Sequence, residues 1–180
     1  MELVAALLED HEEIRSLFDK VAAGTGPRRE ERFDQLREQL VRHEVAEEAI
    51  VRPLTKRYAA DGERVAHARV NEESNAEAIL KEMEGTEMGS ARWDRLFERL
   101  HTAVLRHADK EESVEFPRLQ ATVDSAELAK RGTMFAAAKR LAPTHPHPMT
   151  PNSPAATMVL GPVTAVIDRA RDAVAKALST

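Results

Sequence analysis

Two segments of the chain carry the same arrangement of histidine, glutamate and proline. Residues 43–53 and 107–117 both read HxxxEE, with a proline ten residues after the histidine. In a helix, the histidine and the first glutamate are four positions apart and share a face. These pairs are His43 with Glu47 and His107 with Glu111. Because imidazole and carboxylate are natural ligands of transition metals, the repeat predicts two helices that direct metal ligands at one centre.

These ligand-type residues interrupt apolar stripes that have the three- and four-residue spacing of core-facing helices. The predicted stripes are Leu3, Leu7, His11, Ile14 and Phe18; Phe33, Leu36, Leu40, His43, Glu47 and Ile50; Ala66, Val70, Glu73, Ala76, Leu80 and Met83; and Phe97, Leu100, Val104, His107, Glu111 and Val114. The middle of every stripe is a histidine or a glutamate. The neighbouring Glu48 and Glu112 lie about 100° further around their helices, and we expect them to be mostly solvated.

Such a centre would be costly without a metal. An unpaired buried charge costs several kcal/mol, whereas a domain of this size has a total stability of roughly 5–15 kcal/mol. A single HxxxE is a weak signal and is often a surface pair, but two copies on matching stripes favour a metal site. The predicted ligands are His11, His43, Glu47, Glu73, His107 and Glu111.

The elements that must position these ligands are helices. The apolar periods predict helices over residues 3–22, 28–59 (with a kink at Pro53), from after Gly62 to about 85, from about 90 to 117 or slightly beyond, and 124–142. Short loops join the first four, as in an antiparallel four-helix bundle, so the fold class is all-α. We expect a metal-binding bundle over 1–120, an additional helix packed on or extending it over 121–142, and a proline-rich linker with an amphipathic C-terminal helix over 143–180.

Composition narrows the classes of function. The chain has 180 residues, a net charge of −5 and no cysteine, so thiolate metal sites, cysteine nucleophiles and disulfides are excluded. Its basic residues are interspersed with acidic ones, which does not favour nucleic-acid binding. No signal peptide and no membrane-spanning stretch is recognisable. A cytoplasmic protein that does not bind membranes or nucleic acid is expected.

The chain resembles the hemerythrin-like HHE cation-binding family. The resemblance rests on Asp10-His11-Glu12-Glu13-Ile14, on the segments 43–53 and 107–117, and on Glu72-Glu73, and it covers roughly residues 1–120. It implies an up-down-up-down bundle around two non-haem iron ions joined by an oxo or hydroxo bridge, with manganese or zinc as alternatives. His11, His43 and His107 would be terminal ligands, and Glu47 and Glu111 would bridge the two metals.

The third helix departs from the family pattern. A histidine usually follows its glutamate, but here Glu73 stands at the matching position, and no histidine lies within five residues. Either Glu73 itself binds metal, which we favour because it lies on the stripe, or the second metal is weakly held or absent and Glu73 is solvated. Glu77, one turn further on, is an additional candidate that a solvated helix face explains better.

Three functions are compatible with these residues. The first is a di-iron protein that binds or reacts with O₂, peroxide or nitric oxide, with oxidoreductase activity undecided. The second is an iron-storage, iron-sensing or oxygen-sensing protein without turnover. The third is a structural bundle with a vestigial site. Metal content separates the third from the others, and turnover separates the first from the second.

Overall fold

The computed structural model describes residues 1–142, all of whose regular elements are helices. They are α1 (Leu3–Ala22), α2 (Pro27–Tyr58), α3 (Gly62–Glu84), α4 (Ala91–Lys110), the π-helix η1 (Glu111–Glu115), α5 (Phe116–Thr122) and α6 (Ser125–Leu141). The predicted proline-rich linker and C-terminal helix fall outside the described residues.

Local signals in the sequence determine where these helices begin. Pro27 is the first residue of α2, where its missing N–H and fixed φ are favourable. The Ser90 hydroxyl accepts a hydrogen bond from the Trp93 backbone N–H at 3.2 Å, which caps α4. The Asp124 carboxylate caps α6 in the same way, accepting from the Ala126 N–H at 2.8 Å. The predicted helix starts therefore agree closely with the observed ones.

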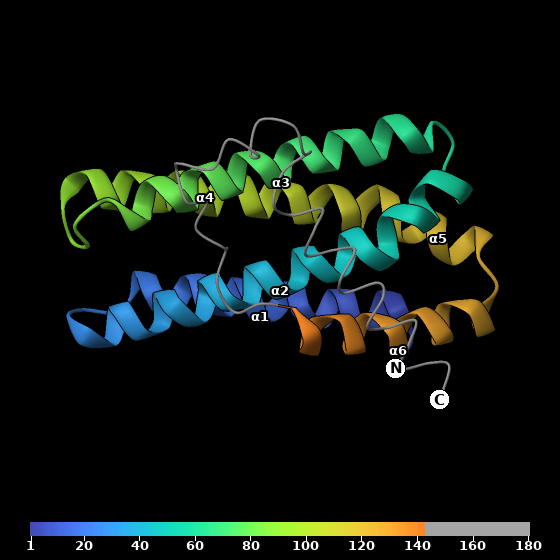
Figure 1. Ribbon diagram of the computed structural model, residues 1–180, viewed down its shortest axis with the longest axis horizontal. Helices are drawn as coiled ribbons and strands as arrows, with labels where there is room; N and C mark the ends of the chain where they lie inside the picture. Colours follow the sequence, from blue (N-terminus) through green and yellow to red (C-terminus); the bar gives the residue numbers. More distant parts are fainter. Residues whose placement is uncertain (143–180) are drawn as a thin grey trace, which may run out of the picture.

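The first four helices form a bundle of two hairpins. Helix α1 packs on α2, α3 packs on α4, and α2 joins the hairpins by packing on α3. Figure 1 shows the two hairpins as two layers with their long axes nearly aligned. Helix α6 lies against α1 and α2 on the outside of this arrangement. The predicted all-α bundle is thus confirmed, with α6 as a further helix on its surface.

Two large apolar cores fill the bundle within the described residues. One contains Ile14, Phe18, Leu36, Trp93 and Leu100 and lies toward the α1–α2 and α3–α4 turns. The other contains Leu3, Leu7, Ile50, Leu54, Phe116 and Phe135 and includes contributions from α5 and α6. Between them the helices place their buried polar residues, which are Asp10, His11, His43, Glu47, Arg52, Thr55, Arg69, Glu73, Glu111 and Glu115. The polar layer is therefore enclosed at both ends by packed hydrocarbon.

Two of the predicted stripe positions are wrong. Val114 is 47% exposed, and Glu115 is buried instead at 2%. The cause is the π-helix η1, whose wider turn inserts an extra residue and shifts the inward-facing position by one. Val70 is 38% exposed, while its neighbour Arg69 is buried and hydrogen-bonded to Glu115. The ion pair with Glu115 thus places Arg69, and not Val70, in the interior.

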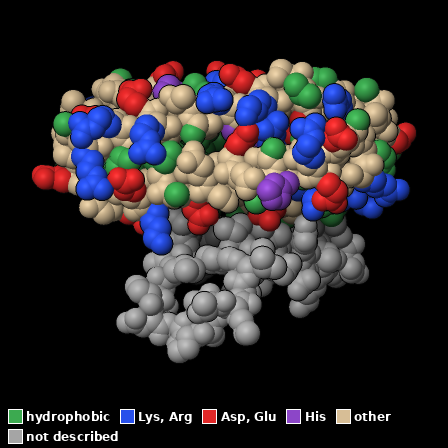
Figure 2. Space-filling model, turned by 90° about the horizontal axis from the view of Figure 1, so that it is seen from above, with side chains coloured by type: hydrophobic (Ala, Val, Ile, Leu, Met, Phe, Trp, Pro, Cys, Tyr) green, Lys and Arg blue, Asp and Glu red, His purple; other side chains and the backbone are tan. Residues whose placement is uncertain are grey.

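The outer surface carries mixed charge. On the face shown in Figure 2, basic and acidic side chains are interspersed. None of the helices in the described residues is long and apolar enough to cross a bilayer.

Candidate metal centre

The structure brings all six predicted ligand residues into the polar layer. His11 comes from α1, His43 and Glu47 from α2, Glu73 from α3, His107 from α4 and Glu111 from η1. Five of them are buried at the level of the whole residue, and the His107 side chain is 11% exposed. One site is therefore assembled from four sequence-distant helices and the π-helix.

Four of these residues form a first cluster, defined as His11, His43, Glu47 and Glu111, with ligand atoms all within 4.8 Å of one another. The Nε2 atoms of His11 and His43 face each other at 3.1 Å. Glu111 Oε2 lies 3.5 Å from His11 Nε2, and Glu47 Oε2 lies 3.7 Å from His43 Nε2. Two imidazoles and two carboxylates thus converge on one small volume.

A second cluster, defined as Glu47, Glu73 and His107, lies beside the first. His107 Nε2 is 3.9 Å from Glu47 Oε2 and 4.0 Å from Glu73 Oε1. His107 Nε2 is also 3.3 Å from Glu111 Oε1, whereas the other oxygen of this carboxylate, Oε2, faces His11. Glu47 belongs to both clusters, and the two oxygens of Glu111 face one histidine of each. This arrangement fits two carboxylates placed between two metal positions.

Each of the three histidines is oriented by a carboxylate on its other nitrogen. His11 Nδ1 pairs with Glu112 Oε1 at 2.7 Å, His43 Nδ1 with Asp10 Oδ2 at 3.1 Å, and His107 Nδ1 with Glu72 Oε2 at 3.1 Å. When a neutral imidazole donates its Nδ1–H to a carboxylate, its Nε2 is an unprotonated acceptor aimed at the centre. This carboxylate–histidine arrangement is the usual support of metal-binding imidazoles.

Basic side chains hold these outer carboxylates in turn. Lys139 of α6 bonds to Asp10 Oδ1 at 2.5 Å, which ties the additional helix to His43. Arg15 bonds to Glu112 Oε1 at 2.8 Å, so Glu112 is not the solvated residue that we predicted. Its side chain is 26% exposed, because it bridges His11 and Arg15.

Arg52 is the central residue that the sequence analysis missed. Its buried guanidinium donates to four carboxylates, those of Glu47, Glu73, Glu111 and Glu115. Glu115 also accepts from the Thr55 hydroxyl and from Arg69. One signal was available, since the internal repeat aligns Arg52, just before Pro53, with Phe116, just before Pro117. The first copy of the repeat therefore has a charged residue at the position where the second copy has an aromatic one, and the two hairpins differ there.

The charges of the centre perturb one another strongly. Burial opposes the charged form of Glu47, but His43 and Arg52 outweigh it and hold the pKa of Glu47 well below its usual range. Burial likewise opposes charge on His43 and His107, yet neighbouring carboxylates raise the pKa of both. Burial and the nearby His43 lower the pKa of His11. Burial raises the pKa of Glu73 despite its bonds to Arg52.

The donor atoms fit a metal. Within residues 1–142, Glu47 Oε1, Glu111 Oε2 and His107 Nε2 are buried and have no hydrogen-bond partner. Buried polar atoms are rarely left unpaired, and each calls for an explanation. The facing Nε2 atoms of His11 and His43 also need a cation or a proton between them. Imidazole with carboxylate is a donor set suited to iron, zinc or manganese.

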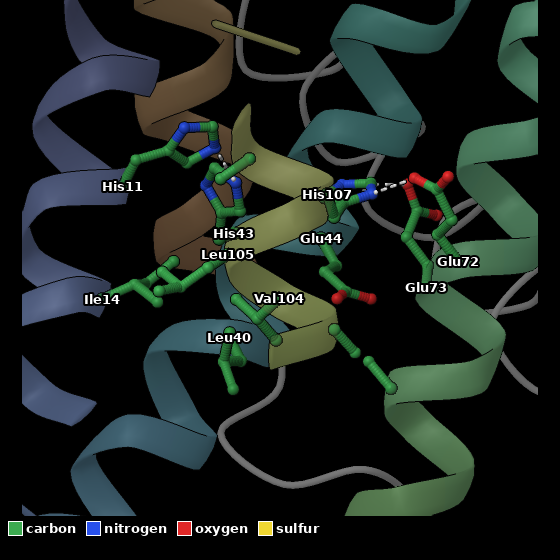
Figure 3. A pocket seen from close by; sticks show the side chains of 13 residues that line it. His11, Ile14, Leu40, His43, Glu44, Glu72, Glu73, Val104, Leu105 and His107 are labelled. Atoms are coloured by element: carbon green, nitrogen blue, oxygen red, sulfur yellow. Dashed lines mark hydrogen bonds and ion pairs between the residues drawn. The ribbon is translucent and has the colours of Figure 1, made fainter. Parts of the chain in front are cut away.

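A small cavity opens beside the clusters. It has a volume of about 20 Å³, with a polar wall that includes His11, His43, Glu44, Glu73 and His107. Ile14, Leu40, Ala76 and Val104 contribute the apolar wall. Figure 3 shows the Glu44 carboxyl group turned into this space, between Val104 and the Glu73 side of the site. The volume suits a water molecule or a ligand of two or three atoms.

Glu77, the additional candidate, and two histidines of α3 and α4 lie outside the centre. Glu77 is exposed, as a solvated helix face requires, and His67 is exposed as well. His101 is half-buried and packs against Phe18 and Phe97 at ring-centroid distances of 4.6 and 6.5 Å. Glu44 was not predicted as a site residue, because it adjoins His43 and lies off the apolar stripe.

The fold and this centre define a helical bundle with a buried histidine–carboxylate cluster that could hold metal. The profile of the Hemerythrin HHE cation binding domain matches residues 2–119. This chain therefore belongs to the hemerythrin HHE cation-binding family, and the family together with the buried cluster indicates metal binding.

Known proteins similar to the chain include one described as an uncharacterized hemerythrin-like protein of Schizosaccharomyces pombe. It is 26% identical over 173 residues, which are 95% of this chain and 85% of that protein. A DNA nickase of Nostoc sp. is 24% identical over 131 residues, which are 72% of this chain and 37% of that protein. The crystal structure of a hemerythrin HHE cation binding domain-containing protein from Mycobacterium kansasii matches with a TM-score of 0.70 at 21% identity. The match covers 78% of this chain and 86% of that one, and it shows a shared fold.

Proposed function

We propose that this chain is a non-haem di-iron protein that binds or reacts with O₂, peroxide or nitric oxide. The observation that carries the proposal is the pair of adjoining clusters that share Glu47 and are both approached by Glu111. His11 and His43 would hold one iron ion, and His107 with Glu73 would hold the other. Glu47 and Glu111 would contact both.

The chain itself supplies the conditions for small-ligand chemistry. When bound, iron would provide an exchangeable coordination position and a change of oxidation state. The cavity of about 20 Å³ brings a small ligand to the histidines and Glu73 and excludes larger molecules. Burial and the nearby Glu73 raise the pKa of Glu44, which favours the protonated form of this carboxyl group at the cavity wall. In that form the group could donate a hydrogen bond to a ligand in the cavity.

The test is anaerobic reconstitution of the full chain with ferrous iron, followed by desalting and elemental analysis. About two iron ions per chain are expected. The diferrous protein is then mixed with O₂, with peroxide and with nitric oxide, and absorption spectra and consumption of each reagent are followed. Retention of no iron would overturn the proposal.

The same experiment separates an enzyme from a binding protein. Repeated consumption of peroxide or O₂ would identify turnover. Iron that stays bound and reacts once, or only changes its spectrum, would identify storage or sensing. Retention of zinc or manganese in preference to iron would change the identity of the metal but not the site.

A further inference from the structure

The Arg52 guanidinium lies inside the second cluster. Its Nη2 atom is 2.5 Å from Glu73 Oε1, 2.8 Å from Glu111 Oε1 and 3.1 Å from Glu47 Oε2. The whole residue is 3% exposed. One nitrogen therefore contacts an oxygen from each of three predicted metal ligands.

These are the oxygen atoms that a metal at His107 would use. Glu47 Oε2, Glu73 Oε1 and Glu111 Oε1 all lie within 4.0 Å of His107 Nε2. A metal ion binds carboxylate oxygen at about 2.0–2.2 Å. An ion coordinated by these atoms would thus be in close contact with Nη2, and two cations would share one set of oxygens.

The first cluster is less affected. Arg52 bonds to its Glu47 Oε2, but the Nε2 atoms of His11 and His43 face each other, and Arg52 does not bond to Glu111 Oε2, which lies nearest His11. Within the described residues, Glu111 Oε2 and Glu47 Oε1 have no hydrogen-bond partner at all. A metal between His11 and His43 can bind Glu111 Oε2 without displacing the guanidinium.

Arg52 also has an alternative hydrogen-bond partner outside the two clusters. Its Nη1 atom already donates to Glu115 Oε1 at 3.2 Å, and Glu115 does not belong to either cluster. Thr55 and Arg69 hold Glu115 in place from the other side. The guanidinium can keep this bond while Nε and Nη2 release Glu47, Glu73 and Glu111.

We propose that Arg52 is a built-in competitor for the second metal, so that the two clusters load in order and with unequal affinity. The first metal binds at His11, His43, Glu47 and Glu111. The second binds at His107 and Glu73 after the guanidinium withdraws to Glu115. This inference rests on the proposed function, because it requires that both clusters bind metal.

The test is an equilibrium titration of the metal-free full chain with Co²⁺ as the only metal. A chromophoric chelator competes for the Co²⁺, and visible absorption follows how much metal the chain has bound. The wild-type chain should bind Co²⁺ in two resolved steps. Replacing Arg52 by methionine (Arg52→Met) should narrow the ratio between the two dissociation constants at least tenfold. Arg52→Lys, which keeps the charge, should leave a wide ratio.

Arg37→Met is the control. Arg37 is also a partly buried cation of α2, but it pairs with Asp34 and Glu84, which belong neither to the clusters nor to their outer carboxylates. Its loss should leave the ratio of the two dissociation constants within about threefold. An equal narrowing of this ratio in Arg37→Met would show that general electrostatics, and not competition at the second cluster, sets the order.

A crystal structure with both clusters filled gives a readout that does not depend on a variant folding. It should show Arg52 bonded to Glu115 and separated from Glu47 and Glu73. Two metals bound with the guanidinium still on Glu47 and Glu73 would overturn the inference and leave the proposed function intact. Absence of any Co²⁺ binding would overturn both.

Discussion

Glu47 and Glu111 are the residues on which the two-metal interpretation depends most. Each lies between histidines of different clusters, and each is fully buried. We expect Glu47→Ala and Glu111→Ala to weaken metal binding more than about 100-fold, since loss of an outer hydrogen-bond partner alone costs about 10–100-fold. Metal content after desalting measures this. Glu77→Ala, on an exposed face of α3, is the control, and equal loss from it would show that the wrong face has been assigned.

The outer carboxylates should matter almost as much. Asp10→Asn removes the negative charge that orients His43, and Glu112→Gln does the same for His11. Each substitution should lower metal affinity about 10–100-fold while the helices stay folded. Equilibrium dissociation constants together with circular dichroism measure both effects. Unchanged affinity in both variants would mean that these contacts do not persist when metal is bound.

Glu73 tests the departure from the family pattern. An anionic oxygen donor favours Fe(III) over Fe(II) more than a neutral imidazole does, so Glu73→His should raise the reduction potential of the iron pair. The diferrous variant should also be oxidised by O₂ more slowly. Potentiometric titration and stopped-flow absorption follow the two effects. No change in either would exclude Glu73 as a ligand and direct attention to solvent as the donor.

The gathering of the candidate ligands in one layer could be predicted from sequence because helical spacing is rigid. His43 and Glu47 must share a face once the segment is helical, and the same holds for His107 and Glu111. Arg52 could not be predicted in this way, because its long side chain reaches carboxylates on α3 and η1 that only the packed bundle brings near. Glu112 was misjudged for a related reason, since its partners His11 and Arg15 lie on α1.

At the scale of elements, the π-helix η1 explains why the second repeat does not fold like the first. The two HxxxEE segments predict equal helices, but residues 111–115 take the wider turn, and Glu115 becomes buried beside Arg52. A single-residue bulge of this kind depends on tertiary partners. The sequence pattern predicts that a segment is helical and which of its residues face inward. It does not predict a local change from α-helix to π-helix.

The packing of α6 gives a prediction about elements. A Cβ atom at Gly132 would lie 2.2 Å from the Met1 carbonyl oxygen and 2.9 Å from the Leu3 nitrogen, so α6 approaches the start of α1 closely. Gly132→Ala should therefore lower the free energy of unfolding by about 1–3 kcal/mol. Chemical denaturation measures this, with Thr133→Ala on the exposed side as the control. A gain of up to about 1 kcal/mol, the helix-propensity effect of alanine, would show that α6 does not contact α1 there.

Because the polar layer lies between two apolar cores, we expect the stability of the whole molecule to depend on metal. In the metal-free chain, Arg52, Arg69 and protonated histidines must balance the buried carboxylates. Bound metal replaces the protons and stabilises the folded state by mass action, by about 2.7 kcal/mol when free metal is 100 times its dissociation constant. For a domain of this size, 1 kcal/mol corresponds to about 2–4 °C in Tm.

The pH dependence of this stabilisation follows from the histidines. Burial disfavours charge on His43 and His107, but the neighbouring carboxylates outweigh it and raise both pKa values in the folded, metal-free chain. Protonation of these groups therefore stabilises the metal-free chain fully below the unfolded histidine pKa of about 6.5, and this contribution is lost as pH rises through the folded pKa. The lowered pKa of Glu47 acts only at more acid pH, where its contribution is lost as pH falls.

Metal binding has the opposite sign, because it must displace those protons. Between pH 8 and 6.5, metal affinity should fall about tenfold per pH unit for each proton released, while the metal-free chain becomes more stable. The lower metal affinity shrinks the difference in Tm between metal-loaded and metal-free protein as the pH is lowered. Differential scanning calorimetry of both forms at pH 8 and 6.5, with zinc at fixed free concentration, measures the difference. A difference that is the same at both pH values would show that binding releases no protons, and that His43 and His107 are already neutral in the metal-free chain.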